Sequence, residues 1–358
     1  MHISDALLSP AVGVTMWAVS AGTIAYCSSK VRKELDDRKV PLMGVLGAFI
    51  FAAQMINFTI PATGSSGHLG GGLILAILLG PYAAFLTIAS VLVVQALFFA
   101  DGGLLALGCN IFNLGFFPAF IAYPFIYKKI IGNKPTPTKL SVASMVAAVI
   151  GLQMGALGVV LQTVSSGISS LPFSSFVVLM QPIYMAIGIV EGLVTAAVVS
   201  FVYKAKPEIL QSALEARPIG NQPVKNVILA FLVVALIAGG IVSWFASKNP
   251  DGLEWSITKV MGMKELKGPE EGLHGSMAAL QERLSFLPDY TFRKPVEVKP
   301  EAGQNQSSHA TMEETKPEEK KTEVNKLGTS VAGIVGGLLS LGVSFLSGFL
   351  LKKRIHSD

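Results

Sequence analysis

The feature that most constrains this chain is a series of apolar segments of about 17 to 25 residues, the length that an α-helix needs to cross a bilayer of about 30 Å. Apolar residues make up 51% of the chain and charged residues only 14%, which excludes an ordinary soluble domain. The alternation expected of a membrane β-barrel is missing, so we expect an all-α polytopic membrane protein. The segments lie at about residues 11–28, 41–58, 82–100, 105–127, 140–165, 176–203, 226–246 and 328–351.

The positions of lysine and arginine predict how these helices are oriented. Basic residues gather in four places, at residues 30–39, 128–139, 204–225 and 352–354. Positive loops stay in the cytoplasm. All four clusters fall on that side only if the N-terminus is outside, the C-terminus is cytoplasmic and the chain crosses the membrane nine times. The ninth crossing is a shorter apolar segment that follows His68.

The first two residues, Met1 and His2, form a potential metal chelate. The free α-amine, the next peptide nitrogen and the imidazole of residue 2 can close a five-membered and a six-membered ring on one cation. Planar nitrogen ligation of this kind suits Ni(II) and, less strictly, Co(II). Unrelated chains also begin with this dipeptide by chance. The prediction requires that Met1 is retained, and a bulky second residue normally prevents its removal.

A glycine-rich segment between Gly64 and Gly72 contains His68. Only about a dozen residues separate this histidine from the next predicted helix, and at 1.5 Å per residue they cover roughly 18 Å, too little to cross the hydrocarbon. We therefore expect a loop that dips into the protein and carries His68 to mid-depth, because irregular backbone is tolerated there only where it lines a cavity. The alternative is a shallow outer loop with His68 at the lipid headgroups.

Asp5 is a candidate partner for one of these imidazoles, because a metal-bound histidine usually donates its other ring N–H to a carboxylate or carbonyl. Equally, Asp5 could accept hydrogen bonds from free amides at the start of the first helix.

The last two predicted spans flank a long polar segment at about 249–326. An anionic surface there could raise the local cation concentration, but residues 301–326 have the composition of a disordered tether. His274 and His309 in this segment could scavenge metal, although scattered surface histidines are more often incidental. His356, in the C-terminal tail, has no expected role.

Several motifs are specific in combination: Met1-His-Ile-Ser-Asp-Ala-Leu-Leu-Ser-Pro10, His68-Leu-Gly-Gly, Leu79-Gly-Pro-Tyr82, Gln95-Ala-Leu-Phe98 and Asp101-Gly-Gly-Leu-Leu-Ala-Leu-Gly-Cys-Asn110. Together they resemble the M-type substrate-capture subunit (CbiM or NikM) of nickel and cobalt energy-coupling-factor (ECF) transporters. The resemblance covers about residues 1–205 and implies a seven-helix unit. It also implies a near-planar metal site made by the amine of Met1, the backbone and imidazole nitrogens of His2, and the imidazole of His68. Ala6 stands where the family usually has glycine, and it touches no ligand.

A second resemblance follows the seven-helix unit. The motif Lys248-Asn-Pro-Asp-Gly-Leu-Glu-Trp255 is similar to the N-type accessory subunit, in which two helices flank an outer loop that begins Pro-Asp-Gly-Leu-Glu. The chain thus resembles a natural fusion, with a metal-capturing M unit at 1–205, a cytoplasmic linker at 206–225 and an N unit at 226–358. The resemblance implies that the N unit assists metal loading.

The chain contains no Gly-x-x-x-x-Gly-Lys-Ser/Thr phosphate loop, so we do not expect it to hydrolyse ATP or to be an enzyme. The resemblance implies that a transmembrane coupling protein and a pair of ABC-type ATPases supply the energy, in a bacterial or archaeal inner membrane. It implies no cofactor beyond the transported metal and no nucleic-acid partner. The expected function is high-affinity uptake of Ni(II), with Co(II) uptake for cobalamin synthesis as the alternative. An ion-driven secondary carrier and a membrane metalloenzyme are more remote alternatives, because Glu191 is nearly alone at depth and no His-Glu-x-x-His motif occurs.

Overall fold

The computed structural model describes residues 1–353 except 133–134, 169–170, 263–268, 270 and 294–325. Each apolar segment that the sequence predicts as a span largely coincides with one of its helices. Within this part, six helices are long and apolar enough to cross a membrane, and two shorter apolar helices accompany them. The all-α, multi-pass prediction is confirmed, whereas the count of nine crossings stays a prediction. The helices are α1 (Pro10–Val31), α2 (Lys39–Gln54), α3 (Gly72–Leu79), α4 (Pro81–Phe99), the continuous stretch of α5 (Leu107–Ile111), η2 (Phe112–Tyr127) and α6 (Lys128–Ile131), then α7 (Pro137–Ser166), α8 (Phe173–Ala205), α9 (Pro207–Leu214), α10 (Lys225–Gly240) and α13 (Lys326–Lys353).

Local sequence signals explain where two of these helices begin. The hydroxyl of Ser9 accepts a hydrogen bond from the N–H of Val12 at 3.4 Å, and a proline occupies the first turn of α1. Thr136 accepts in the same way from the N–H of Lys139 at 3.3 Å, before α7. A side-chain oxygen at this position satisfies one free amide of the first turn, and a proline there costs no helical hydrogen bond.

A short antiparallel hairpin interrupts the helices between α2 and α3. It consists of β1 (Phe58–Ile60) and β2 (Ser65–Gly67). After β2 the chain turns at Gly71, whose φ of +77° favours glycine and where a Cβ would lie 2.7 Å from Ile50. All eight residues of α3 are buried. The hairpin differs from the all-α expectation, and it places His68 directly before this buried helix.

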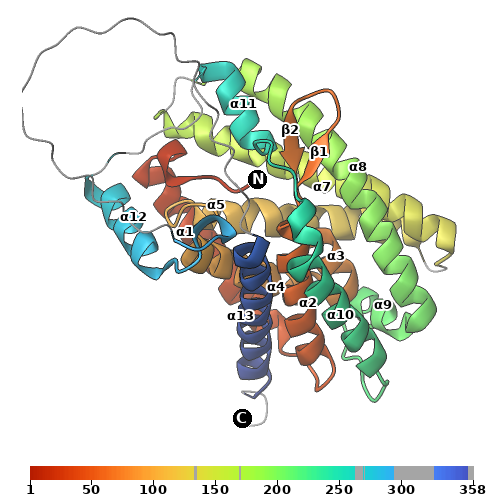
Figure 1. Cartoon of the computed structure of the whole chain (residues 1–358). Coiled ribbons are helices and arrows are strands. Elements are labelled where there is room, and N and C mark those ends of the chain that lie inside the picture. The colour runs from red at the N-terminus through yellow and green to blue at the C-terminus, as the bar shows by residue number, and fades with distance from the viewer. Residues whose placement is uncertain (133–134, 169–170, 263–268, 270, 294–325, 354–358) are drawn as a thin grey trace, which may run out of the picture.

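Small residues let the helices pack closely. A Cβ at Gly188 or Gly192 of α8 would lie 2.9 or 2.8 Å from the backbone of α7, so glycine is required for this approach. The C-terminal helix α13 packs against α2, where a Cβ at Gly336 would collide with the ring of Phe51. The two ends of the sequence therefore belong to one helical assembly (Figure 1).

One face of the bundle carries Met1, the hairpin and the short helix α11; we call it the N-terminal face (Figure 1). The short helix η1 (Asp5–Leu7) follows the first residues, and η3 (Val242–Phe245) follows α10. The helix α11 (Gly252–Met261) contacts α8 and β2, whereas α12 (Gly272–Leu284) contacts α4 and η1. The turn η4 (Pro288–Tyr290) contacts α4 and α13. The predicted tether at 301–326 lies outside the described residues, except that Lys326 begins α13.

Candidate metal centre

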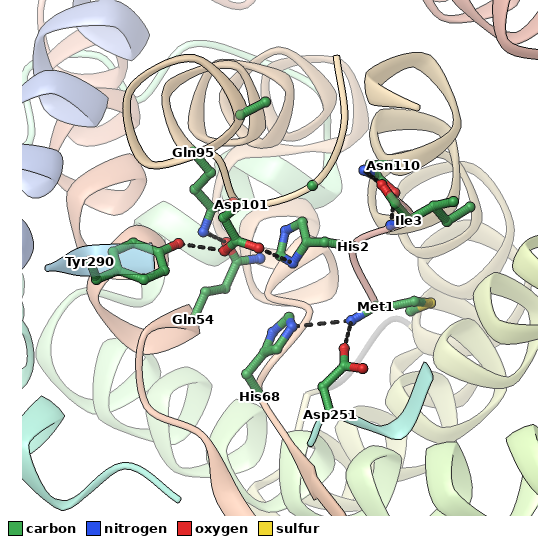
Figure 2. Close-up of polar contacts among 12 residues, drawn as sticks. Met1, His2, Ile3, Gln54, His68, Gln95, Asp101, Asn110, Asp251 and Tyr290 are labelled. Carbon is green, nitrogen blue, oxygen red and sulfur yellow. Dashed lines mark hydrogen bonds and ion pairs between the residues drawn. The ribbon is translucent and has the colours of Figure 1, made fainter. Parts of the chain in front are cut away.

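Met1 lies inside the protein with 3% of its surface exposed. Its amine is 3.1 Å from Nε2 of His68 and 3.0 Å from Oδ2 of Asp251, as Figure 2 shows. Met1 and His68 are thus brought together across 67 residues of sequence. The structure places the amine and one imidazole in direct contact, as the predicted ligand set requires.

The amide side chain of Asn110 holds the N-terminal strand in place. Its Oδ1 accepts from the N–H of Ile3 at 2.8 Å, and its Nδ2 donates to the carbonyl of Ile3 at 3.2 Å. The N–H of Gly103 donates to the same carbonyl at 3.0 Å. Asn110 therefore binds the backbone of residue 3 as a neighbouring strand would, and this fixes the direction of the two residues before it.

His68 presents a lone pair to the amine. Its Nδ1 lies 3.0 Å from the carbonyl of Leu69, which can only accept, so Nδ1 carries the proton and Nε2 is unprotonated. The imidazole of His2 stacks on the ring of His68, with 5.1 Å between ring centroids and an angle of 21°. All three predicted ligand residues therefore meet at one point.

His2 has one ring nitrogen paired and one unpaired. Its Nδ1 lies 3.3 Å from Oδ1 of Asp101, and the hydroxyl of Tyr290 donates to the other carboxylate oxygen (Figure 2). Within the described residues, Nε2 of His2 is buried and has no hydrogen-bond partner. A buried polar nitrogen without a partner is costly, and such atoms often belong to a site that binds something.

Burial lowers the pKa of His2 and of His68, and the nearby positive amine lowers both further. Both imidazoles are therefore neutral at neutral pH, which is the form that binds a metal. Burial raises the pKa of Asp101, but the nearby His2, the hydrogen bond from Tyr290, His68 and the amine lower it together by more, so the net shift is downward. Burial also raises the pKa of Asp251, but the charge of the amine, the hydrogen bonds from the Glu254 N–H and the amine, and His68 lower it together by more, so the net shift is downward. Both carboxylates are therefore anionic beside the cluster.

Polar side chains from three helices hold the glycine loop that carries His68. The carboxylate of Glu191 in α8 accepts from the N–H of Gly70 at 2.7 Å and from the N–H of Gly71 at 3.1 Å. Gln54 donates to the carbonyl of Gly70 at 2.9 Å, and Gln95 donates to Gln54 at 2.9 Å. These side chains therefore position the backbone of the loop.

Two other residues from the sequence analysis bind backbone groups of the protein. The carboxylate of Asp5 accepts from the N–H of Ala106 at 2.9 Å, so the amide that it satisfies lies before α5 rather than at the start of α1. The carboxylate beside the His2 ring belongs to Asp101. His274 was expected on the surface, but it is only 6% exposed, and its Nε2 lies 2.8 Å from the carbonyl of Leu8, so it anchors α12. His309 and His356 lie outside the described residues.

A cavity of about 440 Å³ opens beside these groups. Within the described residues, no three His, Cys, Asp or Glu side chains are arranged to hold a metal by themselves. A metal site here consequently needs nitrogen ligands from the amine and the main chain. Among the residues that the structure describes, the lining contains no lysine or arginine, and its ionisable side chains are His2, His68, Asp5, Asp101, Asp251, Glu254, Asp289 and Tyr290.

The spacing of the nitrogens agrees with ligation. Two nitrogens that each lie about 2.0 to 2.1 Å from one cation, at a right angle, are about 2.8 to 3.0 Å apart. The 3.1 Å between the Met1 amine and Nε2 of His68 is close to this edge of a square. The distance between these two atoms is therefore compatible with two adjacent ligands of one cation.

The sequence analysis missed Asp251 and Tyr290 as neighbours of the site, and it gave Asp101 and Asn110 no individual role. Asp101 and Asn110 are the first and last residues of one motif of the sequence analysis, and Asp251 lies in the Pro-Asp-Gly-Leu-Glu motif. These motifs could have indicated a role for all three residues. Tyr290 had no signal in the sequence.

A helical membrane protein that gathers an amine, two neutral imidazoles and anionic carboxylates around a cavity is a transition-metal transporter component rather than an enzyme. Residues 2–209 match the family described as cobalt uptake substrate-specific transmembrane region (CbiM), and the chain belongs to this family. Residues 225–353 match the PDGLE domain.

Known proteins agree with this assignment. The chain is 30% identical over 318 residues to the fused nickel transport protein NikMN of Rhodobacter capsulatus, covering 81% of this chain and 88% of that protein. It is 26% identical over 285 residues to the cobalt transport protein CbiM of Geobacter sulfurreducens, covering 76% and 81%. A crystal structure of a truncated transition metal transporter is 30% identical, has a TM-score of 0.51, and covers 57% of this chain and 99% of that one. The resemblance to a fused M and N protein is confirmed.

Proposed function

We propose that the chain captures Ni(II) from the outside, with the Met1 amine, the backbone and imidazole nitrogens of His2 and the imidazole of His68 as ligands. The observation that carries this proposal is the contact of 3.1 Å between the amine and Nε2 of His68, inside a cavity with anionic walls. Four nitrogens in a plane suit Ni(II). The amine contributes as a ligand only if Met1 is the first residue of the mature protein.

Loading requires the ring of His2 to turn. The six-membered chelate ring uses Nδ1 of His2, which in the empty site faces Asp101 at 3.3 Å. On loading, Nδ1 transfers from the carboxylate to the metal. The unpaired Nε2 then carries the proton and has the carboxylate of Asp101 within the same cavity as an acceptor. The empty arrangement leaves one buried nitrogen unsatisfied, and the loaded arrangement satisfies both.

Nickel is the preferred cargo and cobalt the alternative. The nickel proposal rests on the planar chelate and on the R. capsulatus relative, which is named for nickel and matches both parts of this chain. The cobalt alternative rests on the relative named for cobalt and on the family description. Both cations accept imidazole and amine nitrogens.

The roles of the domains, the membrane orientation and the energy source are proposed by analogy with the family. Residues 1–205 act as the metal-capturing unit, 206–225 as a cytoplasmic linker and 226–358 as the accessory unit. The N-terminus faces outward and the C-terminus faces the cytoplasm, because this places all four basic clusters inside. A separate coupling protein and a pair of ABC-type ATPases supply the energy.

Metal binding to the purified full chain tests this proposal. Calorimetry with Ni(II) and with Co(II) would compare the intact protein with a form extended by one N-terminal residue and with His68→Ala. The control is His309→Ala, which removes a histidine far from the cluster in sequence. We expect tight Ni(II) binding that the extension and His68→Ala abolish and the control retains. Equal Ni(II) affinity in the intact and the extended protein would overturn the ligand set. Metal transport by the chain without ATPases would favour an ion-driven carrier.

A further inference from the structure

We propose that Asp251 of the PDGLE domain is a positioning residue of the metal centre: its carboxylate holds the Met1 amine where the metal needs it. This inference rests on the proposed function and adds a residue from the second half of the chain. The observation that carries it is the ion pair of 3.0 Å between Oδ2 of Asp251 and the amine, across 250 residues of sequence. The side chain of Asp251 is 19% exposed and that of Met1 is 2% exposed.

The carboxylate of Asp251 is held rigidly by its own helix. Its Oδ1 accepts from the N–H of Glu254 at 2.9 Å and so caps the N-terminus of α11. Its Oδ2 is then directed at the amine. A carboxylate that uses one oxygen for its helix and the other for a ligand has little rotational freedom, which is the requirement for positioning.

The backbone around Asp251 is joined to the strand that carries His68. The N–H of Ser66 donates to the carbonyl of Pro250 at 2.8 Å, and its hydroxyl donates to the carbonyl of Asn249 at 2.8 Å. Ser66 and Asp251 form a parallel bridge. Because Ser66 lies two residues before His68, the same main-chain contacts set the spacing between the carboxylate and the imidazole.

The residue after Asp251 brings the start of α11 against the bundle. A Cβ at Gly252 would lie 2.6 Å from Cγ2 of Ile183 and 3.2 Å from the ring of Tyr184, so only glycine fits this approach. The carboxylate reaches the amine because the helix begins so close to α8. Ordinary capping of α11 requires no such approach, so capping alone does not explain the arrangement.

The hydrogen bond from the amine to Asp251 can persist in the loaded state. When Ni(II) binds, it displaces one proton from the ammonium group and the proton of the His2 peptide N–H, so the net charge beside the carboxylate is unchanged. The metal-bound amine keeps two N–H groups, and one of them can still donate to Oδ2 of Asp251. Replacing the carboxylate by a group that does not accept from the amine should therefore weaken metal binding.

Substitutions that separate charge from capping test the inference on the full chain. Asp251→Asn keeps a capping oxygen and removes the charge, whereas Asp251→Ala removes both. We expect each to weaken Ni(II) binding by about 10- to 100-fold, as is usual for groups that orient ligands. Both variants lose the ion pair with the amine and should lower thermal stability, and the alanine variant should lower it further because it also loses the helix cap. The visible absorption bands of bound Ni(II) should not move, because the nitrogen ligands are unchanged. The matched control is Glu282→Gln in α12, which does not line the cavity.

The outcomes separate this inference from the proposed function. Wild-type Ni(II) affinity in Asp251→Asn would overturn the role of Asp251, and loss in the alanine variant alone would show that capping is sufficient. If the asparagine variant does not fold, Asp251→Ser also caps without charge and replaces it. Failure of the intact wild type to bind Ni(II) and Co(II), or binding that ignores the N-terminal extension, would instead refute the proposed function itself.

Discussion

Removing the carboxylate of Glu191 should loosen the loop that carries His68. Its two oxygens accept from the N–H groups of Gly70 and Gly71 at 2.7 and 3.1 Å, and the side chain is 1% exposed. Leaving a buried donor without a partner costs about 1 to 3 kcal/mol. Glu191→Ala abandons two donors, so we expect the free energy of unfolding to fall by about 2 to 6 kcal/mol.

The glutamine variant is an intermediate case. Glu191→Gln keeps one acceptor and places an NH₂ group against the other N–H, so its free energy of unfolding should fall by about half as much as that of Glu191→Ala. The matched control is Glu215→Gln, because Glu215 and Arg217 form an ion pair that is about half exposed, at 48% and 52%. Such surface pairs contribute only about 0 to 1 kcal/mol.

The assay is chemical or thermal unfolding of the detergent-solubilised protein, followed by Ni(II) binding under native conditions. We expect the order wild type, Glu215→Gln, Glu191→Gln and Glu191→Ala in decreasing stability, with metal affinity lost in the two Glu191 variants. An alanine variant as stable as wild type would refute the reasoning that these two hydrogen bonds hold the loop.

Three further predictions concern other parts of the site. Asn110→Leu removes both hydrogen bonds to Ile3, so Ni(II) affinity should fall by about tenfold or more in calorimetry, and unchanged affinity would contradict the role of this side chain. Gly252→Ala places a Cβ 2.6 Å from Ile183 and should destabilise the protein by about 1 to 3 kcal/mol, whereas Gly240→Ala meets open space and serves as the control in the same unfolding experiment. Ni(II) affinity should fall as the pH decreases, because the metal must displace the protons of the amine and of the His2 peptide N–H. Burial lowers the pKa of both imidazoles, so they are already neutral and add little to the pH dependence of the affinity. Ni(II)-binding titrations that give the same affinity at every pH would argue against the amine as a ligand.

The sequence by itself determined the class of the fold and the three candidate ligands. The length and hydropathy of each apolar segment are local properties, and a bilayer permits few alternatives to a helix, so each predicted span largely coincides with a helix, whereas α11 and α12 were not predicted. The chelate of Met1 and His2 follows from covalent adjacency, and His68 was marked by its glycine-rich surroundings and by the short helix after it.

Only the tertiary structure decided which side chains surround those ligands. Asp251 contacts an amine that lies 250 residues away, and Asp101 and Tyr290 meet beside His2 from segments 189 residues apart. Asp5 could have faced an imidazole or free amides, and the position of α5 directs it to Ala106. The physical reason is that hydropathy and covalent chelation act over a few residues of chain. Contacts between distant segments depend instead on how α8, α11 and the hairpin pack, and no single-sequence pattern encodes that packing.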